Sequence, residues 1–189
     1  MSPRKTATLT RDLVRVAVAA VSDEKRVRRP AGRALFDHLA CLEAGRRAFP
    51  GLDDAAAACA LDRDDLHWPS VTHPGAIVWP AIRECAGGAR AAAAGYEVTV
   101  RLGLALGSEH RRYWHTSATA GTVGAAVAAA LALGLDEERV ADAVGHAASV
   151  AGGSILAILE RSGTRFFHRS HAAAPGIARP GGAPSTRSP

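Results

Sequence analysis

A run of small residues near the middle of the chain constrains the fold more than any other feature. Thr119–Gly134 reads TAGTVGAAVAAALALG and contains no charged or aromatic residue. Small side chains on a helix let neighbouring helices approach closely, so this run is typical of a tightly packed bundle. No stretch alternates for long with period two, and even at Val98–Leu102 we expect helix rather than strand. The sequence therefore predicts an all-α fold.

Apolar spacing and helix-ending residues divide the rest of the chain into helices. Pro30 is well placed as a first helical residue after the charged stretch 22–29, and Asp53 or Asp54 and Asp136 are suited to cap later helices. We expect helices over residues 9–21, 30–49, 53–61, 77–85, 90–106, 117–134, 136–149 and 154–161, with a loop at 108–116. Residues 1–171 would form one helical domain. Residues 172–189 are rich in Pro, Gly and Ala and lack acids, so we expect a disordered tail there.

The charge of the chain is unevenly distributed. The net charge is +5, but residues 34–160 carry nine Lys or Arg against fifteen acids, so the basic excess lies at the two ends. Because there is no basic groove with interleaved aromatic residues, we do not expect nucleic-acid binding. The sequence contains no run of about 18 apolar residues, so it does not indicate a membrane span. The first residues show no secretory signal, and we expect a cytoplasmic protein.

The three cysteines, Cys41, Cys59 and Cys85, are widely spaced, odd in number and include no CxxC pair. This pattern argues against a disulfide framework or a zinc site, and we expect three small buried side chains. No Cys/His cluster would hold an iron–sulfur centre, so the chemistry of this chain should be metal-free.

Polar residues that could carry chemistry gather in three segments. The first, Asp62–Gly75, lies between two apolar helices, where its polar groups must be satisfied or functional. The second surrounds His115, which stands beside a helix N-terminus that can meet an anion. The third, Gly163–Arg169, includes Arg165 and Arg169, which could bind carboxylates bidentately. Each has a structural alternative: surface groups or caps in the first, a capped loop in the second, and solvated charges in the third.

Together these segments supply what elimination of water from a hydroxy-carboxylate requires. Cations or N–H groups must hold the carboxylates, a base must take the proton alpha to one of them, and an acid must help hydroxide leave. His73 and His115 suit the proton transfers, because imidazole titrates near neutral pH. Asp62 would act as the base or orient a histidine, and Arg165 would hold a carboxylate.

Ordered blocks of the sequence resemble the MmgE/PrpD family. ALDRDDLHWPSVTHPGAIVWPA is similar to the family's Asp-x-Asp-Asp-Thr-His stretch followed by His-Pro and an apolar helix. ALFDHLACLEAG precedes this block, and GYEVTVRLGLALG, WHTSATAGTVGAAVAAALALGL, ERVADAVGHAASVAGG and SGTRFFHRSHAA follow it. The resemblance spans roughly residues 33–174.

Members of this family include 2-methylcitrate dehydratase and cis-aconitate decarboxylase, and they have an all-helical domain followed by a smaller α+β lid domain. The resemblance implies a homodimer that acts on a small carboxylate without a metal or organic cofactor. The site residues that it implies are the catalytic Asp62, His73 and His115 and the substrate-binding His67, Arg165 and His168.

Two residues depart from the family pattern: Leu66 stands where the family has Thr, and Arg165 where it often has Lys. The acid-free end of the sequence does not continue the pattern into the lid domain. We expect a hydro-lyase that acts on a small di- or tricarboxylate such as 2-methylcitrate. The alternatives are decarboxylation of a similar acid, a catalytically inactive remnant, and half of a split enzyme completed by a separate lid polypeptide.

Overall fold

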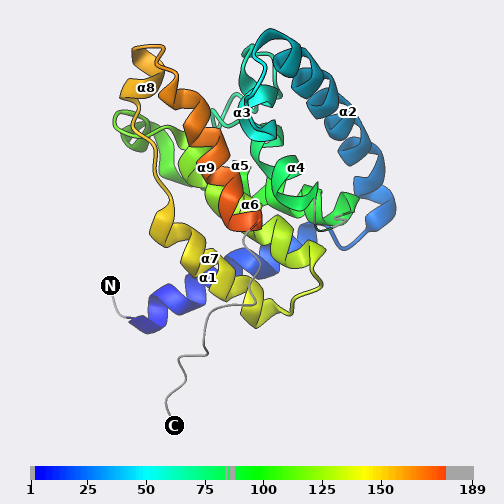
Figure 1. The fold of residues 1–189 in the computed structure, drawn as a ribbon. Helices are drawn as coiled ribbons and strands as arrows, with labels where there is room; N and C mark the ends of the chain where they lie inside the picture. Colours follow the sequence, from blue (N-terminus) through cyan, green and yellow to red (C-terminus); the bar gives the residue numbers. More distant parts are fainter. Residues whose placement is uncertain (1–2, 84, 86–87, 178–189) are drawn as a thin grey trace.

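The computed structural model describes residues 3–83, 85 and 88–177, and within them it contains nine helices and no strand, which confirms the all-α prediction. The helices are α1 (Pro3–Ala20), α2 (Glu24–Ala48), α3 (Asp54–Cys59), α4 (Gly75–Arg83), α5 (Ala89–Arg111), α6 (Thr116–Ala132), α7 (Glu137–Val150), α8 (Leu156–Leu159) and α9 (Thr164–Ile177). They form a bundle in which α6 packs against α4, α5, α7 and α9 (Figure 1). None of the described helices is both long and apolar enough to cross a membrane.

Helix α6, which contains the small-residue run, is the centre of the bundle. Every residue from Thr116 to Ala130 is buried, so this helix is enclosed on all its faces. The backbone of α5 approaches so closely that a side chain at Gly124 would overlap the hydroxyl of Thr99. A side chain at Gly95 would lie 2.8 Å from the Cβ atom of Ala128. The crossing of α5 and α6 therefore requires residues without bulk at both contact points.

Helix α2 begins earlier than predicted. The carboxylate of Asp23 accepts a hydrogen bond from the Arg26 amide at 3.3 Å, which caps a helix that starts at Glu24. Pro30 consequently lies inside α2 instead of at its first position. A good cap upstream thus outweighs the cost of one proline in the helix.

Helices α5 and α8 also differ from their predicted bounds. Helix α5 continues to Arg111 through Gly107, whose φ of 65° marks a kink, so the first part of the predicted loop at 108–116 is helical. Helix α8 is a single turn, shorter than the predicted 154–161. The predicted caps of α3 and α7, Asp53 and Asp136, each accept a hydrogen bond from an amide of the first helical turn.

Helix α9 lies where no helix is predicted, and it continues past residue 171, the predicted end of the domain. Ala172 and Ala173 are buried in a cluster with Ile77 and Ala81 of α4. Contact with other helices therefore stabilises a segment whose own composition favours disorder. The rest of the predicted tail, residues 178–189, lies outside the described residues.

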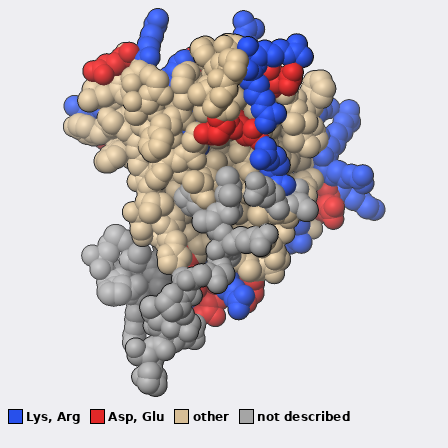
Figure 2. All heavy atoms as spheres, in the orientation of Figure 1, with Lys and Arg blue, Asp and Glu red and all other residues tan. Residues whose placement is uncertain are grey.

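Charged side chains of both signs lie beside one another along the upper and right-hand parts of the face shown in Figure 2. Elsewhere on the surface, Arg15 of α1 pairs with Glu137 of α7 at 2.7 Å. Both side chains are largely exposed, so this pair contributes little to stability.

All three cysteines are free thiols. Cys59 is buried, as predicted, whereas Cys41 and Cys85 are partly exposed. Burial raises the pKa of Cys59 to about 11, so this thiol stays protonated at neutral pH.

Candidate active site

Three segments that are distant in the sequence meet around one cavity of about 190 Å³. The segment between α3 and α4 contributes Asp62 and His73, the start of α6 contributes His115, and α9 contributes Arg165. These are four of the six site residues predicted from the sequence. Figure 1 shows α9 running beside α6. Arg165 and Arg169 of α9 line the cavity together with the first residues of α6.

The segment between α3 and α4 is held in a tight turn just before His73. The amide of His67 donates to the carbonyl of Thr72 at 2.9 Å, and the amide of Val71 donates to the carbonyl of Trp68 at 3.2 Å. Val71 has a φ of 51°, a conformation that β-branched residues rarely adopt. Backbone strain of this kind is found where the surrounding structure holds a functional segment in place.

Asp62 also has a φ of 51°, and its carboxylate pairs with the guanidinium of Arg165 at 2.7 Å. The Asp62 side chain is 68% exposed, whereas that of Arg165 is 25% exposed. An exposed partner can leave the guanidinium at little cost, because surface ion pairs are weak. Arg165 is therefore available to a carboxylate that enters the cavity.

His73 is oriented from both its backbone and its ring. Its amide donates to Ser117 Oγ at 3.2 Å. Its Nδ1 atom lies 3.3 Å from Oδ2 of the buried Asp64, in a contact that is poorly aligned for a hydrogen bond. Burial by itself raises the pKa of Asp64, but His73 and Arg169 beside it outweigh burial and hold that pKa below its ordinary value. The ionised Asp64 would stabilise a positive charge formed on His73.

His115 is the residue before the first turn of α6, and its amide donates to the carbonyl of Gly153 at 2.9 Å. Its Nδ1 atom lies 3.2 Å from Nδ1 of His168. Burial, together with the nearby Arg169 and His168, lowers the pKa of His115 to about 2. His115 is therefore neutral at physiological pH.

The amino end of α6 faces the cavity with unused donors. The amides of Ala118 and Thr119 reach back to the carbonyl of His115, but no hydrogen bond within the described residues uses those of Thr116 and Ser117. The buried hydroxyl of Thr116 also has no hydrogen-bond partner among the residues that the structure describes. Free amides at the start of a 17-residue helix attract an anion.

Arg169 is a site residue that the sequence analysis treated only as an option beside Arg165. It lines the cavity, is 6% exposed and donates to the carbonyl of His73 at 3.3 Å. Within the described residues no carboxylate lies within ion-pair distance of it. A buried charge needs compensation, so this arginine is suited to receive an anionic group. Its place four residues after Arg165 would have signalled a shared face only if a helix had been predicted there.

The model of the MmgE/PrpD N-terminal domain matches residues 51–179, which is more than half of the chain. The chain belongs to the MmgE/PrpD family. The resemblance found in the sequence is thereby confirmed, and the matched region contains every residue that lines the cavity. No curated protein is significantly similar to the chain.

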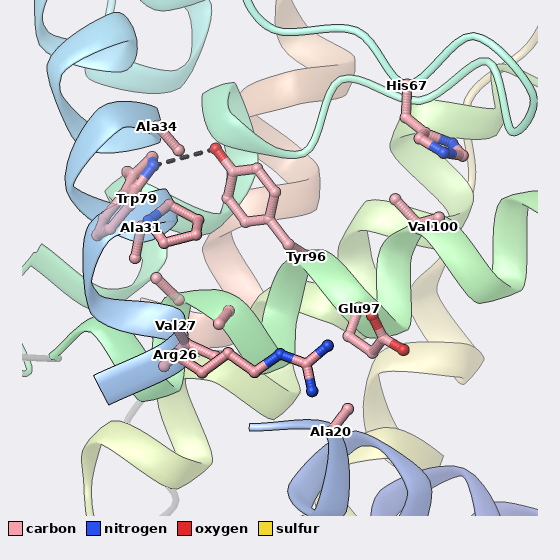
Figure 3. Close-up of a pocket in the computed structure, with 13 residues that line it drawn as sticks. Ala20, Arg26, Val27, Ala31, Ala34, His67, Trp79, Tyr96, Glu97 and Val100 are labelled. Atoms are coloured by element: carbon pink, nitrogen blue, oxygen red, sulfur yellow. Dashed lines mark hydrogen bonds between the residues drawn. The ribbon is translucent and has the colours of Figure 1, made fainter. Parts of the chain in front are cut away.

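Two residues to which the family resemblance assigns substrate binding lie outside the cavity. His67 bonds to Ser70 Oγ at 2.8 Å and borders a different cavity of about 770 Å³, together with Trp79 and Tyr96 (Figure 3). His168 is buried at 7% exposure and contacts His115. Among the described residues, no group of three or more His, Cys, Asp or Glu is arranged to hold a metal ion.

Proposed function

We propose that this cavity is the active site of a lyase that removes water from a small di- or tricarboxylate such as 2-methylcitrate. The observation that supports the proposal is the meeting of two histidines, three arginines and the amino end of α6 around one small space. The histidines are His73 and His115, and the arginines are Arg111, Arg165 and Arg169. Such a site attracts an anion and can move a proton on it.

Carboxylate binding would use the two arginines of α9. Arg165 would exchange its pairing with the exposed Asp62 for a substrate carboxylate. Arg169, which has no carboxylate within ion-pair distance among the described residues, would bind a carboxylate of the substrate as well. A second carboxylate or a hydroxyl would meet the free amides of Thr116 and Ser117. A cavity of about 190 Å³ has the room of roughly six water molecules, which fits a small acid.

The proton transfers would be divided between the two histidines. His73 would take the proton alpha to a carboxylate, because Asp64 at 3.3 Å stabilises the resulting imidazolium. Arg169 would stabilise the negative charge that builds up on that carboxylate. His115 would assist the departing hydroxide through its Nε2 atom. Asp62 would hold Arg165 at the cavity until a substrate carboxylate takes its place.

Decarboxylation of a similar acid is the second candidate. The apolar side chains of Ile155, Ile158 and Phe166 line the same cavity as the arginines. A carboxylate placed against them would lose its hydration, while the cations stabilise the carbanion left by carbon dioxide. The same acid–base groups would then protonate that carbon.

Closure of the cavity would need a further surface. Two of the apolar side chains that line the cavity, Val71 and Trp114, are exposed. A lid, such as one on a separate polypeptide, would cover them and exclude water from the reaction.

We also propose that the chain works in the cytoplasm as a homodimer. Phe36 and Leu39 support the dimer, because these large apolar side chains are exposed on α2.

Turnover tests the proposed chemistry directly. Purified chain mixed with 2-methylcitrate should develop the ultraviolet absorbance of an unsaturated acid, whereas a decarboxylase would release carbon dioxide from cis-aconitate. His73→Ala and His115→Ala should each lower kcat by about a hundredfold or more. His146→Ala, which changes an exposed histidine of α7, is the control and should keep wild-type activity. A wild type inactive on both acids would overturn the proposal, and losses under threefold in both variants would show that these histidines are not the acid–base groups.

A further inference from the structure

His115 and His168 form a buried pair in which each ring presents the same nitrogen to the other. Their Nδ1 atoms lie 3.2 Å apart, and the ring planes are inclined by 45°. The two residues come from the start of α6 and from α9, and both are at least nine-tenths buried. The pair therefore depends on tertiary packing and not on proximity in the sequence.

The backbone around the pair leaves space for it. A Cβ atom at Gly153 would lie 3.2 Å from Nδ1 of His168 and 3.1 Å from the Cβ atom of Ala118. Gly153 has a φ of 124°, and its carbonyl accepts the amide of His115. One glycine thus positions the backbone of His115 and accommodates the ring of His168.

A short contact between two imidazole nitrogens requires one N–H donor and one bare acceptor. If His115 donates from Nδ1, its Nε2 atom is bare and can accept a proton. If His115 accepts at Nδ1, its Nε2 atom carries the proton and can donate it. The direction of this one hydrogen bond therefore decides whether His115 faces the cavity as a base or as an acid.

We propose that His168 is a positioning residue that sets the tautomer of His115, and that it does not bind substrate. The inference rests on the proposed function in one respect, because it assumes that His115 acts on a substrate through Nε2. His115 lines the cavity, whereas His168 does not. The Nδ1 atom of His168 is already engaged with Nδ1 of His115. Within the described residues no hydrogen bond uses Nε2 of His115, which leaves that atom for the substrate.

The proposed role of His115 selects one of these two states. His115 assists the departing hydroxide, so its Nε2 atom must carry a proton and its Nδ1 atom must accept the hydrogen bond from the Nδ1–H of His168. Both rings are neutral in this state, which agrees with the lowering of both pKa values by burial.

Two variants of His168 test this positioning role. His168→Asn keeps a side-chain amide near Nδ1 of His115, which can still donate a hydrogen bond to that atom. His168→Leu removes the hydrogen bond altogether. His171→Asn changes another histidine of α9, which bonds to the carbonyl of Val150, and is the matched control.

Nitrogen-15 NMR of the imidazole rings reads the tautomer of His115 without needing turnover. In the wild type, one Nδ1 of the pair should resonate as protonated and the other as bare. His168→Leu should shift the Nδ1 and Nε2 resonances of His115, while His168→Asn and His171→Asn should keep one defined tautomer. Unchanged His115 resonances in a folded His168→Leu protein would overturn the inference. Circular dichroism and thermal unfolding would show that this variant is folded.

Turnover adds an independent arm. His168→Leu should lower kcat by about 10- to 100-fold, the usual effect of losing a partner that orients a functional histidine, with KM changed less than threefold. A large rise in KM with unchanged kcat would instead assign His168 to substrate binding and refute the proposal. If the wild type turns over none of the acids while the NMR result stands, the proposed function fails and the histidine pairing does not.

Discussion

Arg169→Met is the substitution that best tests whether the cavity is built for an anion. It removes a buried guanidinium that has one hydrogen bond, to the carbonyl of His73, and no carboxylate within ion-pair distance in the described residues. Methionine is apolar and flexible enough to fill the same space. The substitution should therefore affect ligand binding and stability in different ways.

The expected loss of binding follows from the hydrogen bonds that Arg169 would make. Each hydrogen bond to a charged group contributes about 1.5–3 kcal/mol. We assume that Arg169 holds a ligand carboxylate by two such bonds and subtract the cost of desolvating them. Arg169→Met should then reduce the binding free energy of the ligand by about 3 kcal/mol, which raises Kd about a hundredfold. The probe is propane-1,2,3-tricarboxylate, which has the carboxylates of a citrate-like acid but no hydroxyl to eliminate.

Stability without ligand should change little. Replacing a buried charge with an apolar group of similar size is often neutral or stabilising. Two costs oppose this gain: the His73 carbonyl loses a donor, worth about 1 kcal/mol, and the buried Asp64 loses a neighbouring cation. We expect the free energy of unfolding to stay within about 1–2 kcal/mol of the wild-type value.

Thermal unfolding followed by circular dichroism, with and without the tricarboxylate, measures both quantities. A ligand at about 100 times its Kd adds about 2.7 kcal/mol to the stability of the wild type, which raises Tm by roughly 5–10 °C for a chain of this size. Arg169→Met should show almost no rise. The control is Arg112→Met, which changes an exposed arginine 3.3 Å from Glu109 and should respond like the wild type. An equal rise in Arg169→Met and wild type would refute the reasoning.

Three further substitutions test the site and the core. The native pKa of Asp64 is lowered from 3.8, so its charged form stabilises the fold above that pH and this contribution is lost as pH falls through the native pKa. Urea unfolding of Asp64→Asn at pH 7 and pH 3 should show a smaller loss of stability on acidification than the wild type shows. Gly124→Ala should cost about 1–3 kcal/mol or more, because its methyl group would overlap Thr99 at the crossing of α5 and α6. Gly145→Ala, in α7 with nothing within 4 Å, should instead stabilise the fold by about 0.5–1 kcal/mol in the same assay.

The fold could be predicted from the sequence where local rules decide the structure. The capping aspartates of α3 and α7 bond to amides only three residues away, and the small residues of α6 form one uninterrupted run. Such signals can be read from a short stretch of sequence, and these helices form as expected. Helix α9 could not be predicted in this way. Ala172 and Ala173 are helical because they pack against α4, and that contact is invisible in a composition rich in Ala, Gly and Pro.

The same distinction applies to the site. Asp62, His73, His115 and Arg165 were predicted from residue type and family resemblance, and the structure brings all four to one cavity. Burial, however, is a property of the packed molecule. Burial distinguishes Arg169, which is enclosed beside the cavity, from an arginine that is solvated on the surface, and the sequence shows no difference between the two. The contact between His115 and His168 joins residues 53 positions apart and has no local signal.

The small residues of α6 connect the core to the chemistry. Ala118, at the amino end of α6, lies close to Gly153: a Cβ atom added to Gly153 would be 3.1 Å from the Cβ atom of Ala118. The ring of His168 fits beside the same glycine. A larger side chain at Ala118 would displace the backbone at Gly153, whose carbonyl accepts the amide of His115. The contact between His115 and His168 would then be disturbed, because the ring of His168 lies against the same glycine. The small residues of α6 thus both pack the bundle and leave room for the histidine pair at the start of this helix.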